Sequence, residues 1–216
     1  MQLNRSATAL TTAATDAALG LFCLAIVWRL AQVPVNAPWK RALWCWVFGL
    51  LALGSVLGAV AHGLELRGPT LGILWWVLYL SLGVTVALFV VGGIHDWRSE
   101  RAARSALPWA IAAGASFAAL TQLLGGAFIF FVAYEAAAMV ATLAMYIALS
   151  TSGRLAGSGI VAGGIGLSIV AAGVQATALS LRLIVPFDHN GLFHLVQLGA
   201  TAALATGLRR GLERSK

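Results

Sequence analysis

The stretch TLGILWWVLYLSLGVTVALFVVGGI, residues 70–94, contains no charged side chain. A helix rises 1.5 Å per residue, so about 20 apolar residues cross the roughly 30 Å hydrocarbon core of a bilayer. This stretch is long enough, and it predicts an α-helical integral membrane protein. The whole composition agrees, because 60% of the 216 residues are hydrophobic and only 10% are charged, against about 25% charged in soluble domains. The mean hydropathy is +0.89.

Seven apolar segments reach the length of a membrane span. They comprise residues 12–33, 41–64, 70–94, 106–123, 126–149, 157–181 and 190–208. The first follows Arg5 as a signal peptide would, but Asp16 interrupts it and it continues through Trp28 without a small-residue cleavage site. We therefore predict a retained first helix. Because the connections are short, residues 1–216 are expected to form one seven-helix transmembrane domain.

Lysine and arginine residues are concentrated on one side of the predicted bundle. Eleven lie in alternate loops and in the C-terminal tail, at Arg29, Lys40, Arg41, Arg98, Arg101, Arg104, Arg154, Arg209, Arg210, Arg214 and Lys216. Only Arg5, Arg67 and Arg182 fall on the other side. The positive-inside rule then predicts a cytoplasmic C-terminus and an outside N-terminus, with a bacterial inner (plasma) membrane as the location. The same pattern explains the net charge of +7 without a nucleic-acid partner.

The segment 157–181 is unusually rich in glycine. Gly159 and Gly163 are four residues apart, a spacing that lets neighbouring helices approach closely in a membrane. We interpret this pattern as packing inside the bundle rather than as a dimer face. It leaves the oligomeric state open.

Eight polar side chains gather at the predicted outer end of the bundle. Imidazole and carboxylate groups are costly at membrane depth and often mark functional sites there. The eight residues are Asp16, His62, Glu65, Glu135, Asp188, His189, Asn190 and His194. His95, which precedes Asp96, is instead expected in a cytoplasmic loop and apart from this group.

The three histidines of this group predict a metal site. Imidazole is the commonest protein ligand for transition metals, and we expect His62, His189 and His194 to hold zinc. His189 and His194 are five residues apart, which is about 140° around an ideal helix. They can reach one ligand only if the seventh helix begins near Asn190, with His189 on its first, irregular turn. Asp188 or Asn190 would then cap that helix.

The remaining polar residues suit supporting roles around such a metal. A zinc-bound water has a pKa of about 7, and Glu65, Asp188 or Asp16 is the expected general base or orienting group. Glu135 and Asn190 are expected to support the metal ligands. Each residue also has a structural alternative. Asp188 would simply cap a helix, Glu65 would pair with a nearby arginine, and Asp16 and Glu135 would bond to neighbouring helices.

Two short motifs carry a family resemblance. The run AHG at residues 61–63 ends the second segment, and DHNGLFH at residues 188–194 opens the seventh. They resemble the CREST superfamily of seven-helix membrane proteins, which includes alkaline ceramidases, progestin and adipoQ receptors and lipid-remodelling proteins. In those proteins a histidine near the end of helix two and an H-x-x-x-H pair opening helix seven bind zinc. The resemblance implies cleavage of amide or ester bonds in lipids by a zinc-activated water.

The chain departs from that superfamily at three places. Gly58 stands where a serine precedes the helix-two histidine by four residues, and residues 69–77 lack the aspartate expected early in helix three. Asn190 stands where the first histidine of the helix-seven pair is expected, with His189 one place earlier. This His-Asn-x-x-x-His run is also similar to an uncharacterised bacterial family of seven-helix proteins.

The sequence therefore leaves several functions open. The first is a zinc-dependent hydrolase that acts on a lipid-like amide or ester at the outer leaflet of the bilayer. The second is a receptor or sensor that binds a metal or lipid-like ligand without turnover, as the missing serine and aspartate would favour. A haem held by two histidines is a further alternative. Retinal is not expected, because Lys40 and Lys216 do not lie in the middle of a predicted helix.

An ion- or proton-coupled transporter ranks third. It would use Asp16, Glu135 and the histidines as a relay. Such a relay needs polar residues that continue toward the cytoplasmic side. There the predicted helices offer little beyond Thr142, Ser168 and Thr201.

Overall fold

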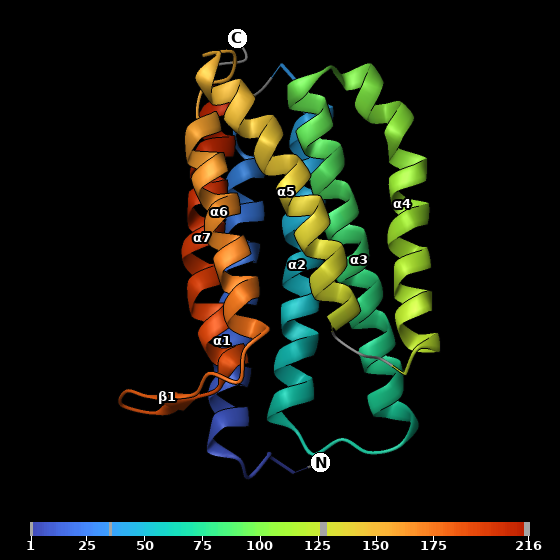
Figure 1. Cartoon of the computed structure of the whole chain (residues 1–216), viewed down its shortest axis with the longest axis vertical. Coiled ribbons are helices and arrows are strands. Elements are labelled where there is room, and N and C mark those ends of the chain that lie inside the picture. Colours follow the sequence, from blue (N-terminus) through green and yellow to red (C-terminus); the bar gives the residue numbers. More distant parts are fainter. Residues whose placement is uncertain (1, 35, 126–128, 214–216) are drawn as a thin grey trace.

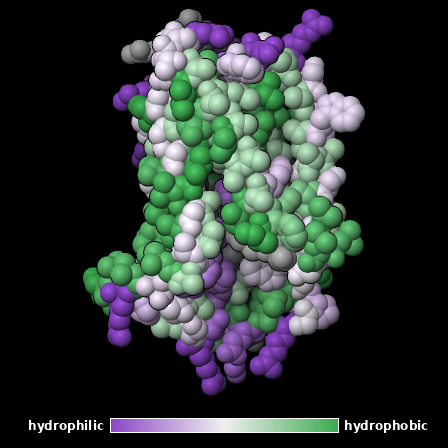
Figure 2. Space-filling view, viewed as in Figure 1, coloured by the Kyte–Doolittle hydropathy of each residue, from purple (hydrophilic) through white to green (hydrophobic). Residues whose placement is uncertain are grey.

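The computed structural model describes residues 2–34, 36–125 and 129–213 (Figure 1). Its helices are α1 (Ala7–Ala31), α2 (Pro38–Gly63), α3 (Pro69–Trp97), α4 (Glu100–Leu123), α5 (Ile129–Thr151), α6 (Ser158–Gln175) and α7 (His189–Glu213). A small hairpin of β1 (Leu181–Arg182) and β2 (Pro186–Phe187) precedes α7. All seven helices are long and apolar enough to cross a membrane, which confirms the prediction of an all-α integral membrane protein. Figure 2 shows hydrophobic residues across the middle of one face, with hydrophilic residues at both ends.

Six of the helices form a closed ring. Helix α1 packs against α2 and α7, α3 packs against α2 and α5, and α6 lies between α5 and α7. Helix α4 lies outside the ring against α3 (Figure 1). A methyl group on Gly83 of α3 would lie 2.6 Å from the carbonyl oxygen of Gly114 of α4. Glycine at both positions therefore permits this close contact.

The two ends of the bundle differ. The end that carries the N-terminal residues, the α2–α3 connection and the β1–β2 hairpin is called the hairpin end. The opposite end, where α7 finishes, is called the tail end (Figure 1). The hairpin protrudes sideways from the bundle, and its Leu183 and Ile184 side chains are exposed.

The expected span 157–181 is too long, because α6 ends at Gln175. Thr177 stabilises this end, since its hydroxyl donates to the Val174 carbonyl and accepts from the Leu179 backbone N–H. The apolar residues after Gln175 belong to the exposed hairpin. Judged by hydropathy alone, they look like a continuation of the membrane span. The expected span 126–149 begins at residues that lie outside the described ranges, and α5 is described from Ile129.

The expectation that glycines of the segment 157–181 pack inside the bundle is confirmed for two of them. A methyl group on Gly157, which immediately precedes α6, would overlap the Gly207 carbonyl oxygen. One on Gly164 would lie 3.0 Å from the Ala200 carbonyl oxygen. Both neighbours belong to α7. Gly163 has no such neighbour within 4 Å, so the glycine pattern serves the α6–α7 contact only in part.

A buried ion pair joins α2 and α3 at the tail end. Lys40 Nζ lies 2.6 Å from Asp96 Oδ1, and both side chains are at most 3% exposed. The Tyr146 hydroxyl of α5 donates to Asp96 Oδ2 at 2.8 Å, and His95 Nδ1 lies 3.2 Å from Asp96 Oδ1. The prediction that Lys40, His95 and Asp96 lie in loops is wrong, because α2 begins at Pro38 and α3 continues to Trp97. The tail end is therefore more polar inside than the sequence indicated.

Replacing Lys40 by methionine should lower the free energy of unfolding by about 3–5 kcal/mol, because Asp96 would stay buried without its counter-charge. The double variant Lys40→Met/Asp96→Leu should recover most of that loss, since both buried charges are then gone. Unfolding followed by circular dichroism in detergent measures both effects. The exposed pair Arg209–Glu213 is the control, and Arg209→Met should cost less than about 1 kcal/mol. A double variant as unstable as Lys40→Met would contradict this account.

Candidate functional site

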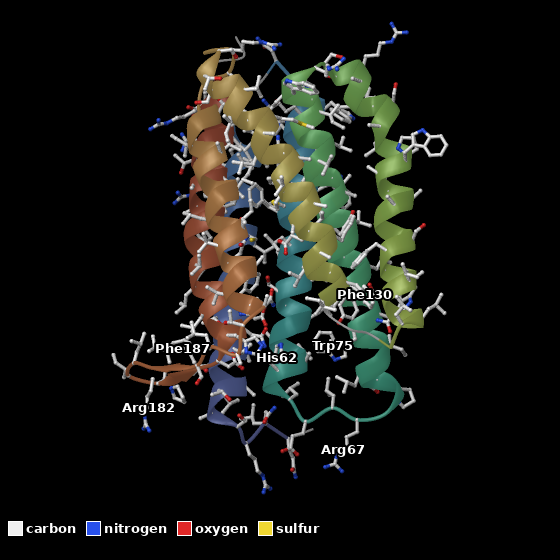
Figure 3. All side chains as sticks on the ribbon, in the orientation of Figure 1. His62, Arg67, Trp75, Phe130, Arg182 and Phe187 are labelled. Atoms are coloured by element: carbon white, nitrogen blue, oxygen red, sulfur yellow. The ribbon has the colours of Figure 1, made fainter. Side chains whose placement is uncertain are left out.

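A cavity of about 430 Å³ lies inside the helix ring at the hairpin end. Every helix of the ring contributes to its wall, and α4 does not. Its polar lining residues include Asp16, Ser55, His62, Glu135, Gln175, His189, Asn190, His194 and Gln197. Trp75, Tyr79, Phe131 and Phe193 add aromatic rings to the wall. In Figure 3, His62 and Trp75 lie at the same level near this end, and their rings meet edge to face at 6.0 Å.

Six of the eight residues singled out in the sequence line this one cavity. They are Asp16, His62, Glu135, His189, Asn190 and His194. Glu65 lies apart in the α2–α3 connection, where its backbone N–H donates to the Gln2 carbonyl. Asp188 stands next to the cavity, close enough to act electrostatically on both His62 and His194. His95 lies at the tail end with Asp96, apart from this group as expected.

His194 is held between two consecutive residues of α1. Its Nδ1 atom lies 3.1 Å from the Thr15 hydroxyl, and its Nε2 atom lies 3.1 Å from Asp16 Oδ1. The Thr15 hydroxyl is also within hydrogen-bond distance of two backbone carbonyl oxygens of its own helix, those of Thr11 at 3.1 Å and Thr12 at 2.9 Å. Asp16 and His194 thus form an acid–base pair that faces the cavity.

Thr15 is a residue that the sequence reasoning missed. Its side chain does not line the cavity, but its hydroxyl contacts Nδ1 of His194 and so helps to orient that ring. The signal was present in the sequence, because Thr12, Thr15 and Asp16 are spaced i, i+3 and i+4 and therefore share one face of the helix. Ser55, Gln175 and Gln197 are polar lining residues to which no role was assigned.

Gly58 makes room for Asp16. A methyl group at position 58 would lie 2.7 Å from Asp16 Oδ2 and 3.0 Å from Asp16 Oδ1. The Asp16 carboxylate therefore occupies the space that a larger side chain at this position would need. A serine at this position would overlap the Asp16 carboxylate as it is placed.

Asp188 fixes the start of α7. Its Oδ1 atom accepts from the Gly191 backbone N–H at 2.9 Å and from the Thr12 hydroxyl at 2.8 Å. The cap predicted at this position is thereby confirmed, and it also ties α7 to α1. Because α7 begins at His189, both His189 and His194 reach the cavity despite their separation of five residues.

The three histidines, as placed, do not form a metal centre. Within residues 2–34, 36–125 and 129–213, no three His, Cys, Asp or Glu side chains are arranged to hold one ion. A zinc-bound imidazole must offer one ring nitrogen to the metal, whereas both nitrogens of His194 already have partners. The described side chains therefore do not fit the zinc site that the resemblance implies.

The sequence matches the model of a family of unknown function (DUF6962) over residues 11–213. The match runs from the first turns of α1 to the end of α7 and includes the whole cavity lining. No curated protein and no solved structure matches the chain.

The Gly58→Ala variant tests the contact with Asp16. We expect it to lower the free energy of unfolding by about 1–3 kcal/mol, the usual cost of overpacking a well-packed interior. Gly49→Ala on the same helix is the matched control, because a methyl group there meets nothing within 4 Å. It should be neutral or slightly stabilising. Unfolding in detergent measures both, and equal effects at the two positions would contradict the proposed packing.

Proposed function

We propose that this chain, which belongs to the DUF6962 family, binds a lipid-like molecule in the cavity at the hairpin end. The observation that carries the proposal is a 430 Å³ cavity inside a ring of membrane-spanning helices, with acid–base groups among its lining residues. Small-molecule sites typically measure about 300–1,000 Å³ and combine an apolar wall with a few polar groups. Leu51, Leu78 and Leu82 supply aliphatic surface for a hydrocarbon chain, and the Asp16–His194 pair supplies polar contacts.

The position of the cavity favours access from the bilayer. Its lining includes Ile129 and Val132 at the start of α5 and Ala176 just after α6. Helix α5 starts well short of the ends of α2 and α3 (Figure 1), and Ile129 is 60% exposed. The cavity rim therefore includes apolar helix surface, which in a membrane contacts lipid. A molecule with a hydrocarbon chain would enter there without crossing water.

The charge distribution supports an outward-facing cavity. Arg67 and Arg182 lie at the hairpin end (Figure 3), whereas Arg98, Arg209 and Arg210 belong to helix ends at the tail end. By the positive-inside rule the tail end is cytoplasmic. The ligand would accordingly come from the outer leaflet of the membrane.

Of the activities that such binding would serve, a receptor or sensor without turnover is favoured. The cavity groups can hold a polar head, and the side chains as placed do not fit a catalytic metal. The second candidate is a zinc-dependent hydrolase of a lipid-like amide or ester. One observation favours it, namely that His62, His189 and His194 all line the same cavity.

Photocrosslinking tests lipid binding. A long-chain alcohol with a diazirine near its end should label cavity residues such as Leu78 and Phe193. The Leu78→Trp variant should reduce this labelling several-fold, because the larger ring fills the cavity. Val140→Trp is the control, since Val140 is 59% exposed on the outer surface and should leave labelling unchanged. Labels confined to outward residues, such as Trp109 of α4, would overturn the proposal.

Elemental analysis tests the metal site on which the hydrolase depends. We expect protein purified without chelators to contain no stoichiometric zinc. About one zinc per chain, lost in His62→Ala and His194→Ala variants that still fold, would instead establish a metal site, and an assay for cleavage of lipid amides and esters would then separate the hydrolase from a receptor that binds metal. Glu65→Ala should have no effect on metal content, because Glu65 does not line the cavity.

A further inference from the structure

An apolar groove of about 530 Å³ lies between α2, α3 and α4 and shares no lining residue with the cavity at the hairpin end. Helix α4 stands outside the ring and packs mainly against α3 (Figure 1). Leu88 of α3 is buried at the floor of the groove, whereas Trp46 of α2 and Ile111 of α4 are 65% and 41% exposed on its walls. Each described residue that lines the groove is apolar. Because the groove opens on the outside of the bundle, it faces lipid in a membrane and suits a hydrocarbon chain.

The guanidinium of Arg104 stands at the tail end of this groove. Its Cζ atom lies 4.8 Å from the centre of the Trp39 ring, which lines the groove. Arg104 precedes Leu107 by three residues and Ile111 by seven, so it shares the face of α4 that forms the groove wall. Glu100 Oε1 accepts from its Nε at 2.8 Å and lies 2.7 Å from its Nη2. A guanidinium has five N–H donors, so Arg104 is held in place and still has donors for a second anion.

Positive charge is in excess around Arg104. Arg101 lies one turn earlier on α4, and Arg98 ends α3 with its guanidinium 4.7 Å from the centre of the Trp97 ring. All three arginine side chains are exposed, and Glu100 is the one acidic residue between positions 98 and 104. Basic side chains beside a groove between membrane-spanning helices are typical of sites for anionic lipid head groups. The apolar groove and its charged end therefore fit the two parts of one amphipathic molecule.

We propose that this groove binds an anionic phospholipid from the leaflet at the tail end, which is cytoplasmic by the positive-inside rule. Arg104 and Arg101 bind the phosphate, and one acyl chain lies along the groove against Trp46 and Leu88. The site is additional to the lipid-binding cavity and lies toward the opposite end of the bundle. A zwitterionic phospholipid with the same chains makes the same hydrocarbon contacts, but its cationic group is repelled by the arginines, so it binds more weakly.

Native mass spectrometry of the whole chain tests this head-group preference. Dioleoylphosphatidylglycerol should bind about fivefold more tightly than dioleoylphosphatidylcholine, the effect of about one arginine at a membrane surface. Arg104→Gln should remove most of that preference and leave binding of the zwitterionic lipid unchanged. Arg209→Gln is the matched control. Arg209 is 57% exposed and pairs with Glu213 four residues away, as Arg104 pairs with Glu100, but it belongs to α7 and not to the groove. Its loss should leave the preference intact.

A second pair of variants tests the groove itself. Ile111→Trp places a larger ring in the groove and should weaken binding of the anionic lipid several-fold. Leu120→Trp on the same helix is the control, since Leu120 is 53% exposed and lies outside the groove. Equal binding of the two phospholipids, equal effects of Arg104→Gln and Arg209→Gln, or equal effects of the two tryptophan variants would each overturn the proposal. None of these variants alters a residue that lines the cavity at the hairpin end, so the proposed function is tested separately.

Discussion

The structure depends on how one buried carboxylate is accommodated. Asp16 lies at membrane depth in α1, where an uncompensated charge is costly. Gly58 of α2 leaves space for it, and His194 of α7 pairs with it. These contacts bring the first, second and last helices together and so close the ring. Asp188 reinforces the same junction, since it caps α7 and accepts from Thr12 of α1.

The two ends of the bundle treat buried charge differently. At the tail end Asp96 has Lys40, Tyr146 and His95 as partners, so its charge is compensated within the protein. At the hairpin end Glu135 retains an oxygen without a partner. Asp96 and Glu135 are both buried among the helices of the ring. They therefore differ in their hydrogen-bond and charge partners and not in how deeply they are buried.

Much of the fold was predictable from hydropathy, because long uncharged stretches have few stable alternatives to a spanning helix. The common location of six polar residues followed from helix direction alone. Lys40 and Asp96 were not predictable, since a charge in the first or last turn of a helix has the same sequence pattern whether it faces solvent or the interior. The end of α6 was missed because the exposed hairpin after Gln175 is itself apolar. The partners of His194 could not be predicted from the sequence. The spacing of residues does not show that Thr15 and Asp16 contact its two ring nitrogens.

The stripe of α5 that faces the interior shows that packing alone does not require a carboxylate at position 135. Met139 lies one turn further along the same buried stripe, which shows that an apolar side chain fits this surface. An apolar residue at position 135 would satisfy packing without leaving a buried oxygen unpaired. A buried oxygen without a partner is destabilising. A molecule that gave Glu135 a hydrogen bond or a counter-charge would therefore link ligand binding to folding stability through this one side chain, because any molecule that binds only the folded state stabilises it.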